Sequence, residues 1–597
     1  MSTSCESDRK VGGTHVGGGA DVGREARIGR EARIGGEARA GREARVRVTR
    51  RLQMTAPPVS RREAIGYGVG TAAAGALLGT LGTRDAEAAA ARTLSDWLAG
   101  RPARELPQPR VLRSSHGELD VRLTTRRGIV DMGAPRRVRT YTYDDVVPGY
   151  TWEINPGDML RVHLRNRLPK LHHPDHMRMD RPHEWTTTNL HTHGLHVSPS
   201  GNADNIFLVV PPGEDHRLEF PLPADHTGGL FWYHPHHHGG VTQSLRGGMA
   251  GAIIVRGDID KVEEVRAARE KLVVLQAIEL GDHYQLMEPD PDPAPDKSFF
   301  PKTQVLYTVN GVLRPKLTMY PGEVQRWRIL NASPGTFMSL HLKHHDFHVL
   351  AWDGLTLAAP ETDGVVMLSA GNRVELLVKA GRPGRYDLVL TPGSSQSPDI
   401  PGMPAATPGG SAAGMGGMPG FPLLKGENDR RTIMTVEVKG HGPQMRLPTA
   451  LPAWDPPIRP IARHRDFAFT IQEPGGVFMN FGINGVAYDP GRQPYKPVVG
   501  TAEEWTLRNV FDREVADHAH VYHIHTNPFK IIRRNGKVLE KPLWRDTYVI
   551  TKHDGDSITF ESNFDDYTGR FVEHCHVVSH EDLGMMAEIE VVRPPRH

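Results

Sequence analysis

Eight histidines stand out in this sequence because they occur in pairs, with a single residue between the two members of each pair. In a β-strand, residues two apart point to the same face, so each pair presents two imidazoles to one site. A lone pair is often an accident of composition, but four pairs predict a site for several transition-metal ions. The pairs are His191/His193, His234/His236, His523/His525 and His574/His576.

Cys575 lies between the last two of these histidines. Strand alternation turns its sulfur to the opposite face, where it can serve a second metal site behind the first. Two imidazoles, one thiolate and a weak axial thioether form the blue-copper electron-transfer site. His520, His580 and Met585 are candidates for the other three groups. The chain itself would then connect the two sites, one residue away from Cys575 in each direction.

A sequence repeat predicts the domains that position these residues. Three stretches show strand-like alternation and each has a Gly and an Asn nine positions apart: residues 156–166, 321–331 and 499–509. Short alternating segments with Gly/Pro turns, and no convincing long amphipathic helix, predict an all-β protein of antiparallel sandwiches or barrels. We expect three homologous domains at residues 105–258, 259–440 and 455–597.

The second domain lacks the histidine pairs. Counted from a glycine that recurs near the end of each domain, Val389 and Thr391 stand where the other two domains have histidines. We therefore expect the metal ions between domains 1 and 3. Residues 392–426 are rich in Gly, Pro and Ser and precede the last strand of domain 2, which predicts a long surface loop.

The N-terminal part of the chain has a different character. Residues 1–53 contain a six-residue repeat of Gly, Arg, Glu and Ala that has almost nothing to bury, and we expect this extension to be disordered and to lie upstream of the natural start. Residues 54–88 have the layout of a twin-arginine export signal with cleavage near Ala88. Its uncharged run is mostly Gly and Ala, so we expect a secreted or cell-envelope protein with no stable membrane span.

Charge and cysteine content exclude two further classes. The formal net charge of +2 comes from the first 88 residues, and the remainder is slightly acidic, so no nucleic-acid partner is expected. Only two cysteines are present, which excludes a disulfide framework.

The motifs HTHG, FWYHPH, HVYHIH and HCHVVSHEDLGMM resemble the four copper motifs of the three-domain multicopper oxidases, the family of laccases, bilirubin oxidases and cuprous oxidases. The resemblance covers about residues 105–597 and implies three consecutive cupredoxin-like Greek-key β-barrel domains. It also implies four copper ions per chain, one of type 1, one of type 2 and a type 3 pair. The implied ligands are His520, Cys575, His580 and Met585 for type 1, His191 and His523 for type 2, and His193, His234, His236, His525, His574 and His576 for type 3.

The resemblance implies a reaction as well. One-electron oxidation of a reducing substrate at the type 1 copper is coupled in this family to the four-electron reduction of oxygen to water at the trinuclear cluster. Reducing oxygen to water consumes protons, so acidic residues near the cluster should matter. Glu581 matches a family position for a proton-delivering carboxylate, and Asp204 is a candidate for the other acid.

Neighbouring histidines leave another register open. His236 and His238 also form a pair, but the repeated glycines align His234 and His236 with the last pair of domain 3, and we favour that alignment. The histidines that could shift the register are His196, His237, His238 and His518. Two further histidine clusters, in residues 171–176 and 344–348, are interpreted as solvated or packed side chains.

The reductant is the least determined part of the prediction. We expect a laccase-like oxidase of phenols and aromatic amines. The alternative is a cuprous oxidase that serves copper tolerance, because soft thioethers select Cu(I) and Met403, Met415 and Met418 lie in the Gly/Pro-rich loop. A catalytically inactive scaffold is disfavoured, because all twelve ligand positions are filled.

Overall fold

The computed structural model describes residues 101–171, 178–294, 297–393, 431–472, 480–512 and 518–595, together with residues 94, 97 and 98. Some predictions lie outside these residues, namely the extension 1–53, the signal 54–88, and the 392–426 loop from residue 394 on, with Met403, Met415 and Met418. Within the described part of the chain, no helix has the length and apolar character to cross a membrane.

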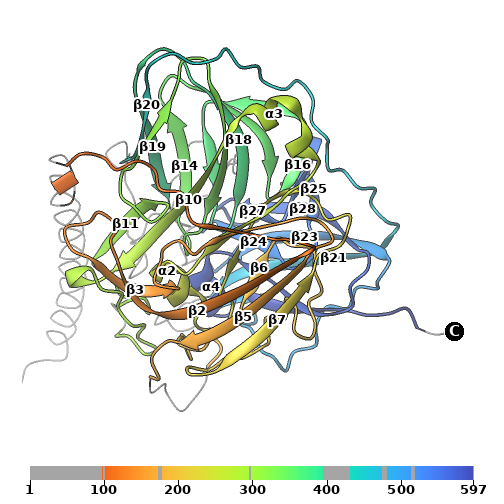
Figure 1. The fold of residues 1–597 in the computed structure, drawn as a ribbon. Coiled ribbons are helices and arrows are strands. Elements are labelled where there is room, and N and C mark those ends of the chain that lie inside the picture. Colours follow the sequence, from red (N-terminus) through yellow and green to blue (C-terminus); the bar gives the residue numbers. More distant parts are fainter. Residues whose placement is uncertain are drawn as a thin grey trace, which may run out of the picture. The chain divides into compact units, whose positions relative to one another are not determined.

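Three units, each made of two β-sheets, follow one another along the described chain (Figure 1). This arrangement confirms the prediction of an all-β protein. The first unit combines a sheet of order β1-β4-β9-β8-β6 with one of order β3-β2-β5-β7. Its strands are β1 (Val111–Arg113), β2 (Glu118–Val130), β3 (Val138–Tyr143), β4 (Thr151–Ile154), β5 (Met159–Arg167), β6 (His191–His193), β7 (Asp215–Pro221), β8 (Gly229–His234) and β9 (Gly251–Val255).

The second unit combines sheets of order β11-β10-β13-β18-β15-β16 and β12-β20-β19-β14-β17. Its strands are β10 (Arg269–Leu280), β11 (Gln304–Val309), β12 (Lys316–Met319), β13 (Val324–Asn331), β14 (Phe337–Leu342), β15 (Phe347–Trp352), β16 (Leu355–Asp363), β17 (Val366–Leu368), β18 (Arg373–Lys379), β19 (Gly384–Gly393) and β20 (Arg431–Val438).

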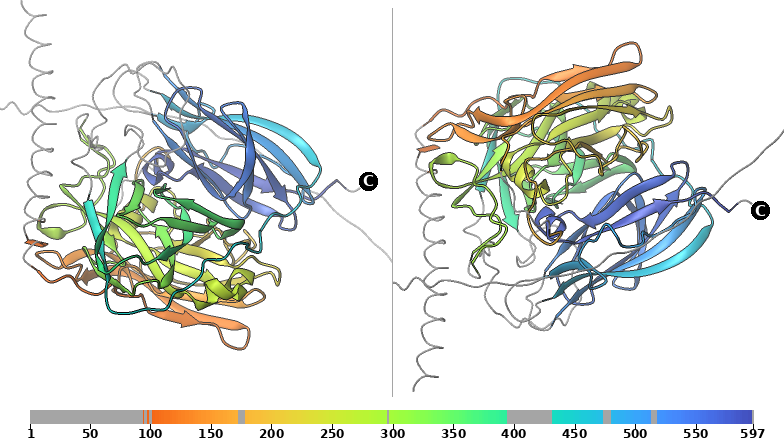
Figure 2. Two further views of the ribbon diagram at one scale, coloured as in Figure 1. Left: turned by 90° about the horizontal axis from the view of Figure 1, so that it is seen from above. Right: turned by 90° about the horizontal axis from the view of Figure 1, so that it is seen from below.

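The third unit combines sheets of order β22-β21-β23-β28-β25-β26 and β27-β24-β29-β30. Its strands are β21 (Ile461–Gln472), β22 (Asn480–Ile483), β23 (Thr501–Phe511), β24 (His520–Ile524), β25 (Phe529–Arg534), β26 (Lys537–Arg545), β27 (Thr547–Ile550), β28 (Ser557–Phe564), β29 (Gly569–Cys575) and β30 (Met586–Val591). Figures 1 and 2 show the strands of the three units as orange-to-yellow, green and cyan-to-blue groups.

Short helical segments connect these strands. The helices are α2 (Val241–Gly247), α3 (Glu263–Ala267) and α4 (Val578–Asp582), and the 3-10 turns are η1 (Asp258–Lys261) and η2 (Asp282–Tyr284). Helices α2 and α4 join the first and third units, because the buried Asp582 carboxylate accepts the main-chain N–H groups of Gly239 and Thr242, both at 2.7 Å.

The repeated Gly and Asn have a structural reason. The strands that carry the repeat, β5, β13 and β23, pair in parallel with β2, β10 and β21 of their own units. The three repeat glycines turn into these strands with φ of +80° to +85°, a region that favours glycine. At the other end, each buried asparagine donates from its amide to two main-chain carbonyls; Asn166, for example, reaches Thr186 and Val210, both at 2.8 Å.

Each unit has its own apolar core, and a further apolar cluster is shared by all three. The shared cluster includes Leu230 from β8, Val274 from β10 and Val578 from α4. The middle unit therefore packs against both units that carry the histidine pairs.

Candidate metal centre

The four histidine pairs converge on one buried site between the first and third units. Strands β6 and β8 place His191 opposite His234, and strands β24 and β29 place His523 opposite His574. All eight rings are at most 1% exposed. The alternation seen in the sequence thus becomes a cluster because two equivalent pairs of strands face each other.

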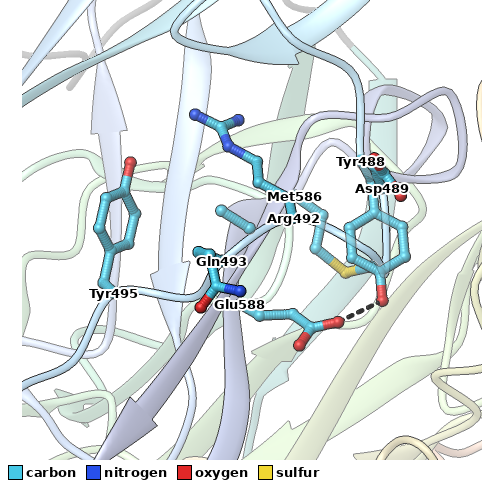
Figure 3. Close-up of a pocket in the computed structure, with 8 residues that line it drawn as sticks. Tyr488, Asp489, Arg492, Gln493, Tyr495, Met586 and Glu588 are labelled. Atoms are coloured by element: carbon cyan, nitrogen blue, oxygen red, sulfur yellow. Dashed lines mark hydrogen bonds between the residues drawn. The ribbon is translucent and has the colours of Figure 1, made fainter.

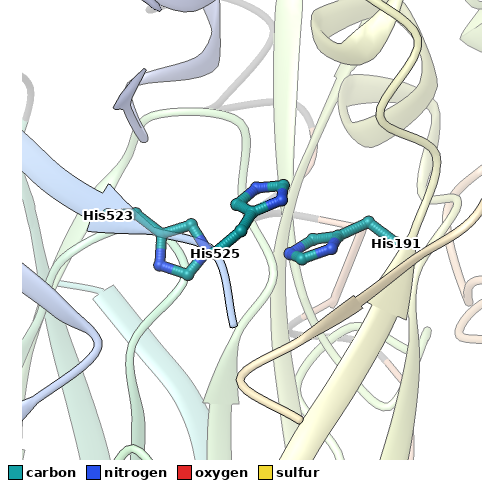
Figure 4. A group of neighbouring side chains, drawn as sticks. All are labelled: His191, His523 and His525. Atoms are coloured by element: carbon teal, nitrogen blue, oxygen red, sulfur yellow. The ribbon is translucent and has the colours of Figure 1, made fainter. Parts of the chain in front are cut away.

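Rings from the two units stack on one another. The His191 ring lies on that of His525 with centroids 3.8 Å apart and an interplanar angle of 8°, and the His193 ring lies on that of His523 at 3.8 Å and 9°. Figure 4 shows His523 and His525, at the end of β24, beside His191 from β6. One nitrogen from each of these three rings lies within 4.8 Å of the other two.

A second group of three comes from His236, His525 and His574. The Nε2 atom of His236 is 3.2 Å from that of His574 and 3.1 Å from that of His525, and the His236 ring stands nearly perpendicular to both. The three nitrogens therefore meet at one point, as ligands of one ion do. A third group of ring nitrogens within ligand distance of one another is His191, His193 and His234. The His576 ring lies 5.0 Å from that of His193.

Several of these rings are fixed by one hydrogen bond and leave the other nitrogen unpaired. The acceptors for Nδ1–H are the Asp204 carboxylate for His191 (2.9 Å), the Pro235 carbonyl for His234 (2.9 Å) and the Asp546 carbonyl for His523 (2.7 Å). Among the described residues, the buried Nε2 atoms of these three rings have no partner. His193 is the reverse, with Nε2 3.1 Å from the Thr547 hydroxyl and Nδ1 unpaired.

These unpaired nitrogens show that the site fits a metal. An unsatisfied buried polar atom costs about 1–3 kcal/mol, and a coordinated ion removes that cost. Burial lowers the pKa of His236 and of His574 to about 3. It also lowers the pKa of each of five other rings well below the usual value, those of His193, His234, His523, His525 and His576. The rings are therefore neutral, the form that binds metals, and a set of imidazoles suits copper.

A second buried group lies on the other face of β29. The Cys575 Sγ is 3.5 Å from His520 Nδ1 and 3.7 Å from His580 Nδ1, and these two nitrogens are 3.2 Å apart. Met585 is buried beside them, and its carbonyl accepts the Cys575 N–H at 3.1 Å. Burial raises the pKa of the Cys575 thiol to about 12, so a thiolate here needs a cation next to it.

Both candidate acids contact histidines of the cluster. The carboxylate of Glu581 is fully buried and lies 3.0 Å from His574 Nδ1 and 3.4 Å from His236 Nδ1. Burial raises the pKa of Glu581 to about 7. Asp204 accepts the hydrogen bond from His191 and so fixes the orientation of that ring.

The neighbouring histidines make other contacts. His238 Nε2 bonds the Met179 carbonyl at 2.9 Å, so the structure directs His236, and not His238, into the cluster. His518 lies beside His580, with ring centroids 6.2 Å apart, and is not in the group formed by His520, Cys575 and His580. The other two contact carboxylates: His196 that of Asp566 and His237 that of Glu184.

The middle unit has the same strands without the ligands. Strands β14 and β19 place His341 opposite Val389 and Ser339 opposite Thr391, on an open hollow of that sheet. The strand pairing aligns His341 with His523, a match that the sequence analysis missed. Within the described residues of this unit, no group of metal-ligand side chains is found.

Asp546, between β26 and β27, is a further contact of the cluster that the sequence analysis missed. Its side chain groups with His193 and His523. The residues around it form no motif, and only the fold brings it to the histidines.

Comparison with known proteins agrees with this geometry. Three family models described as multicopper oxidase match residues 182–259, 275–407 and 456–595, together more than half of the chain. The multicopper oxidase mco of Staphylococcus aureus is 22% identical over 82% of this chain and 93% of its own length. A laccase of Bacillus subtilis is 22% identical over 76% of this chain and 91% of its own length.

Solved structures show the same fold. A multicopper oxidase from Campylobacter jejuni, described as a metallo-oxidase, matches with a TM-score of 0.61 at 22% identity, over 82% of this chain and 98% of that one. A laccase from Pediococcus acidilactici matches with a TM-score of 0.63 at 21% identity, over 82% and 94% of the two chains. The chain therefore belongs to the multicopper oxidase family, the copper-dependent oxidoreductases that pass electrons from a reducing substrate to oxygen.

Proposed function

We propose that the protein is a laccase-like oxidase of phenols and aromatic amines with four copper ions. The proposed ligands are His520, Cys575, His580 and Met585 for type 1, His191 and His523 for type 2, and His193, His234, His236, His525, His574 and His576 for type 3. The observation that carries this proposal is the convergence of buried, unpaired ring nitrogens from two units. Copper bound there would accept electrons one at a time from the reductant and supply four of them to one oxygen molecule.

The chain itself joins the two groups. His574 directly precedes Cys575 and His576 directly follows it, so one peptide bond on each side separates the cysteine residue from a histidine of the cluster. The His580 ring stacks on Phe481 with centroids 4.5 Å apart, and both residues are buried. This packing excludes water from the type 1 group and holds its imidazole in place.

The proposed proton donors are Glu581 and Asp204. Glu581 contacts two cluster imidazoles, and burial favours its protonated form, so it can hold a proton next to the place where oxygen is reduced. Asp204 is bound to His191 and combines proton delivery with positioning of that ring.

A pocket next to the type 1 segment does not enclose an aromatic substrate. It lies along β30, where Tyr488 donates a hydrogen bond to Glu588 at 2.9 Å and Met586 forms part of the wall (Figure 3). The pocket has room for about one water molecule. A reductant that gives up its electron at the protein surface, without being engulfed, fits this shape.

Oxygen uptake by the copper-loaded protein tests the substrate. We expect fast uptake with a methoxyphenol, without added Cu(II), and no change after deletion of residues 400–420. The alternative is a cuprous or metal oxidase, favoured by the relative from C. jejuni described as a metallo-oxidase. That alternative predicts fast uptake with Cu(I), phenol oxidation that depends on added copper, and loss of both on deletion.

Removal of copper should destabilise the protein. The proposed ligands come from the first and third units, so copper binding holds these units together, and a tight site adds about 4 kcal/mol when free copper is 1,000-fold above its Kd. We expect the melting temperature of the apo form to fall by about 10 °C or more in calorimetry. Equal melting temperatures of the apo and copper-loaded forms would refute a bridging role.

We also propose export by the twin-arginine route, with residues 54–88 as the signal. The proposal rests on the arginine pair, the uncharged run and the small residues before the cleavage site. Mass spectrometry of the exported protein should find an N-terminus near residue 89. A mature chain that starts before Met54 would overturn it.

A further inference from the structure

Arg373 of the middle unit contacts all three units. It is the first residue of β18 and is fully buried. Its guanidinium donates two hydrogen bonds to the Asp546 carboxylate of the third unit, at 2.7 and 2.6 Å. Its Nε–H donates to the Leu230 carbonyl of the first unit at 3.2 Å, and a terminal N–H donates to the Asp353 carbonyl at 3.1 Å. The guanidinium also lies 3.6 Å from the buried Asp353 carboxylate of its own unit.

Asp546, which Arg373 holds in place, is hydrogen-bonded to one histidine of the cluster directly and to a second through Thr547. Its main-chain carbonyl accepts Nδ1–H of His523 at 2.7 Å. Its carboxylate accepts the Thr547 hydroxyl at 2.8 Å, and that hydroxyl lies 3.1 Å from His193 Nε2. These bonds decide which nitrogen of each ring is left to face the cluster, Nε2 in His523 and Nδ1 in His193.

The surroundings leave little freedom at this junction. A Cβ on Gly194, directly after His193, would collide with the terminal nitrogen of Arg373 and with the Asp546 carboxylate. A Cβ on Gly371, two residues before Arg373, would lie 2.9 Å from His576 Nε2. The middle unit thus contacts the cluster in two ways. Gly371 lies directly against His576, and Arg373 acts through its hydrogen bonds to Asp546.

We propose that Arg373 is a positioning residue of the trinuclear centre. Through Asp546, it holds the His193 and His523 rings in the orientation that presents one unpaired nitrogen each. Lysine cannot replace it, because only a guanidinium makes the paired bonds to the carboxylate while donating to Leu230. The proposal rests on the proposed copper ligands, and it gives the unit without copper a role in holding copper in the other two.

Substitution of Arg373 by methionine tests the proposal, with Arg328→Met as the matched control. Arg328 is equally buried in the same sheet and pairs with Glu375, Asp260 and Glu270, away from the cluster. We expect Arg373→Met to weaken copper binding at the trinuclear centre by 10- to 100-fold and to change the type 2 EPR spectrum, while the type 1 absorption stays. Arg328→Met should lower the melting temperature without changing either copper signal.

A second pair of variants separates positioning from stability. Asp546→Asn should give the same change in the type 2 spectrum as Arg373→Met. The double variant removes both members of the Arg373–Asp546 pair, so its melting temperature should recover in part while the spectral change remains. The recovery is partial because the buried Asp353 carboxylate, 3.6 Å from the guanidinium, also loses this ion pair. If Arg373→Met does not fold, Asp546→Asn and the double variant give the answer.

Two results would overturn the proposal. One is a type 2 spectrum and copper content in Arg373→Met, or in Asp546→Asn, equal to those of the wild type. The other is the same spectral change in Arg328→Met. If the wild type itself binds no copper at the trinuclear centre, the proposed function fails, and that outcome is distinct from a wild type that binds copper and variants that bind it equally well.

Discussion

Replacement of Cys575 by serine should abolish the blue colour and lower the rate of oxygen consumption by at least ~1,000-fold. The sulfur lies within 3.7 Å of a nitrogen of His520 and of His580, and it is the only thiolate donor in the described part of the chain. A serine hydroxyl is a poor copper ligand because it holds its proton at neutral pH. Visible absorption and oxygen uptake of the copper-loaded variant measure both effects.

The control for this variant is His518→Gln, because His518 is the buried histidine next to the type 1 group that the geometry leaves out of the ligand set. The control should remain blue and active. The trinuclear signals should persist in Cys575→Ser, because the cluster histidines lie on the opposite face of β29. A blue and active Cys575→Ser variant, or a colourless His518→Gln variant, would contradict the proposed type 1 site.

Replacement of Glu581 by glutamine should slow oxygen reduction by about 100-fold and leave the blue colour unchanged. Glutamine keeps the size of the side chain but cannot exchange a proton with the site. Burial raises the pKa of Glu581 to about 7, so the wild type loses this proton donor as the pH rises through neutrality. Turnover of the wild type should therefore fall above pH ~7, and the variant should lack this part of the pH profile.

Glu573→Gln is the matched control. Glu573 is fully buried, as Glu581 is, but it lies on β29 and faces away from the cluster. Its carboxylate accepts a hydrogen bond from the Tyr522 hydroxyl at 3.0 Å. Its replacement should leave oxygen reduction and its pH profile unchanged. Equal turnover of Glu581→Gln and wild type at every pH would show that another group delivers the protons.

The sequence predicts the histidine cluster well because its pattern is local. Strand alternation places His574 and His576 on one face and Cys575 on the other. The facing strands of the first unit then complete the histidine cluster, and His520 and His580 of the third unit complete the group around Cys575. The three-unit organisation can also be predicted from the sequence. Each unit has the same parallel strand pair, which needs a glycine at the turn into the strand and a buried asparagine, such as Asn166, at its end.

The contacts that orient the rings could not be predicted in this way. Asp546 and Arg373 are 173 positions apart and meet only because the middle unit packs against both others. The equivalence of His341 and His523 depends on how β14 pairs with β19. The repeated glycine near the end of each domain lies on β19, so counting from it does not align the residues of β14. The bond from Asp204 to His191 likewise crosses a loop whose path the sequence leaves open.

The ratio of reductant oxidised to oxygen consumed tests the central claim most directly. The copper-loaded protein is supplied with a one-electron donor such as a methoxyphenol, and both the oxygen uptake and the hydrogen peroxide formed are measured. We predict four electrons taken up per oxygen molecule, with no accumulation of peroxide. A ratio of two electrons per oxygen molecule, with peroxide as the product, would show that the histidine cluster does not carry out the four-electron reduction.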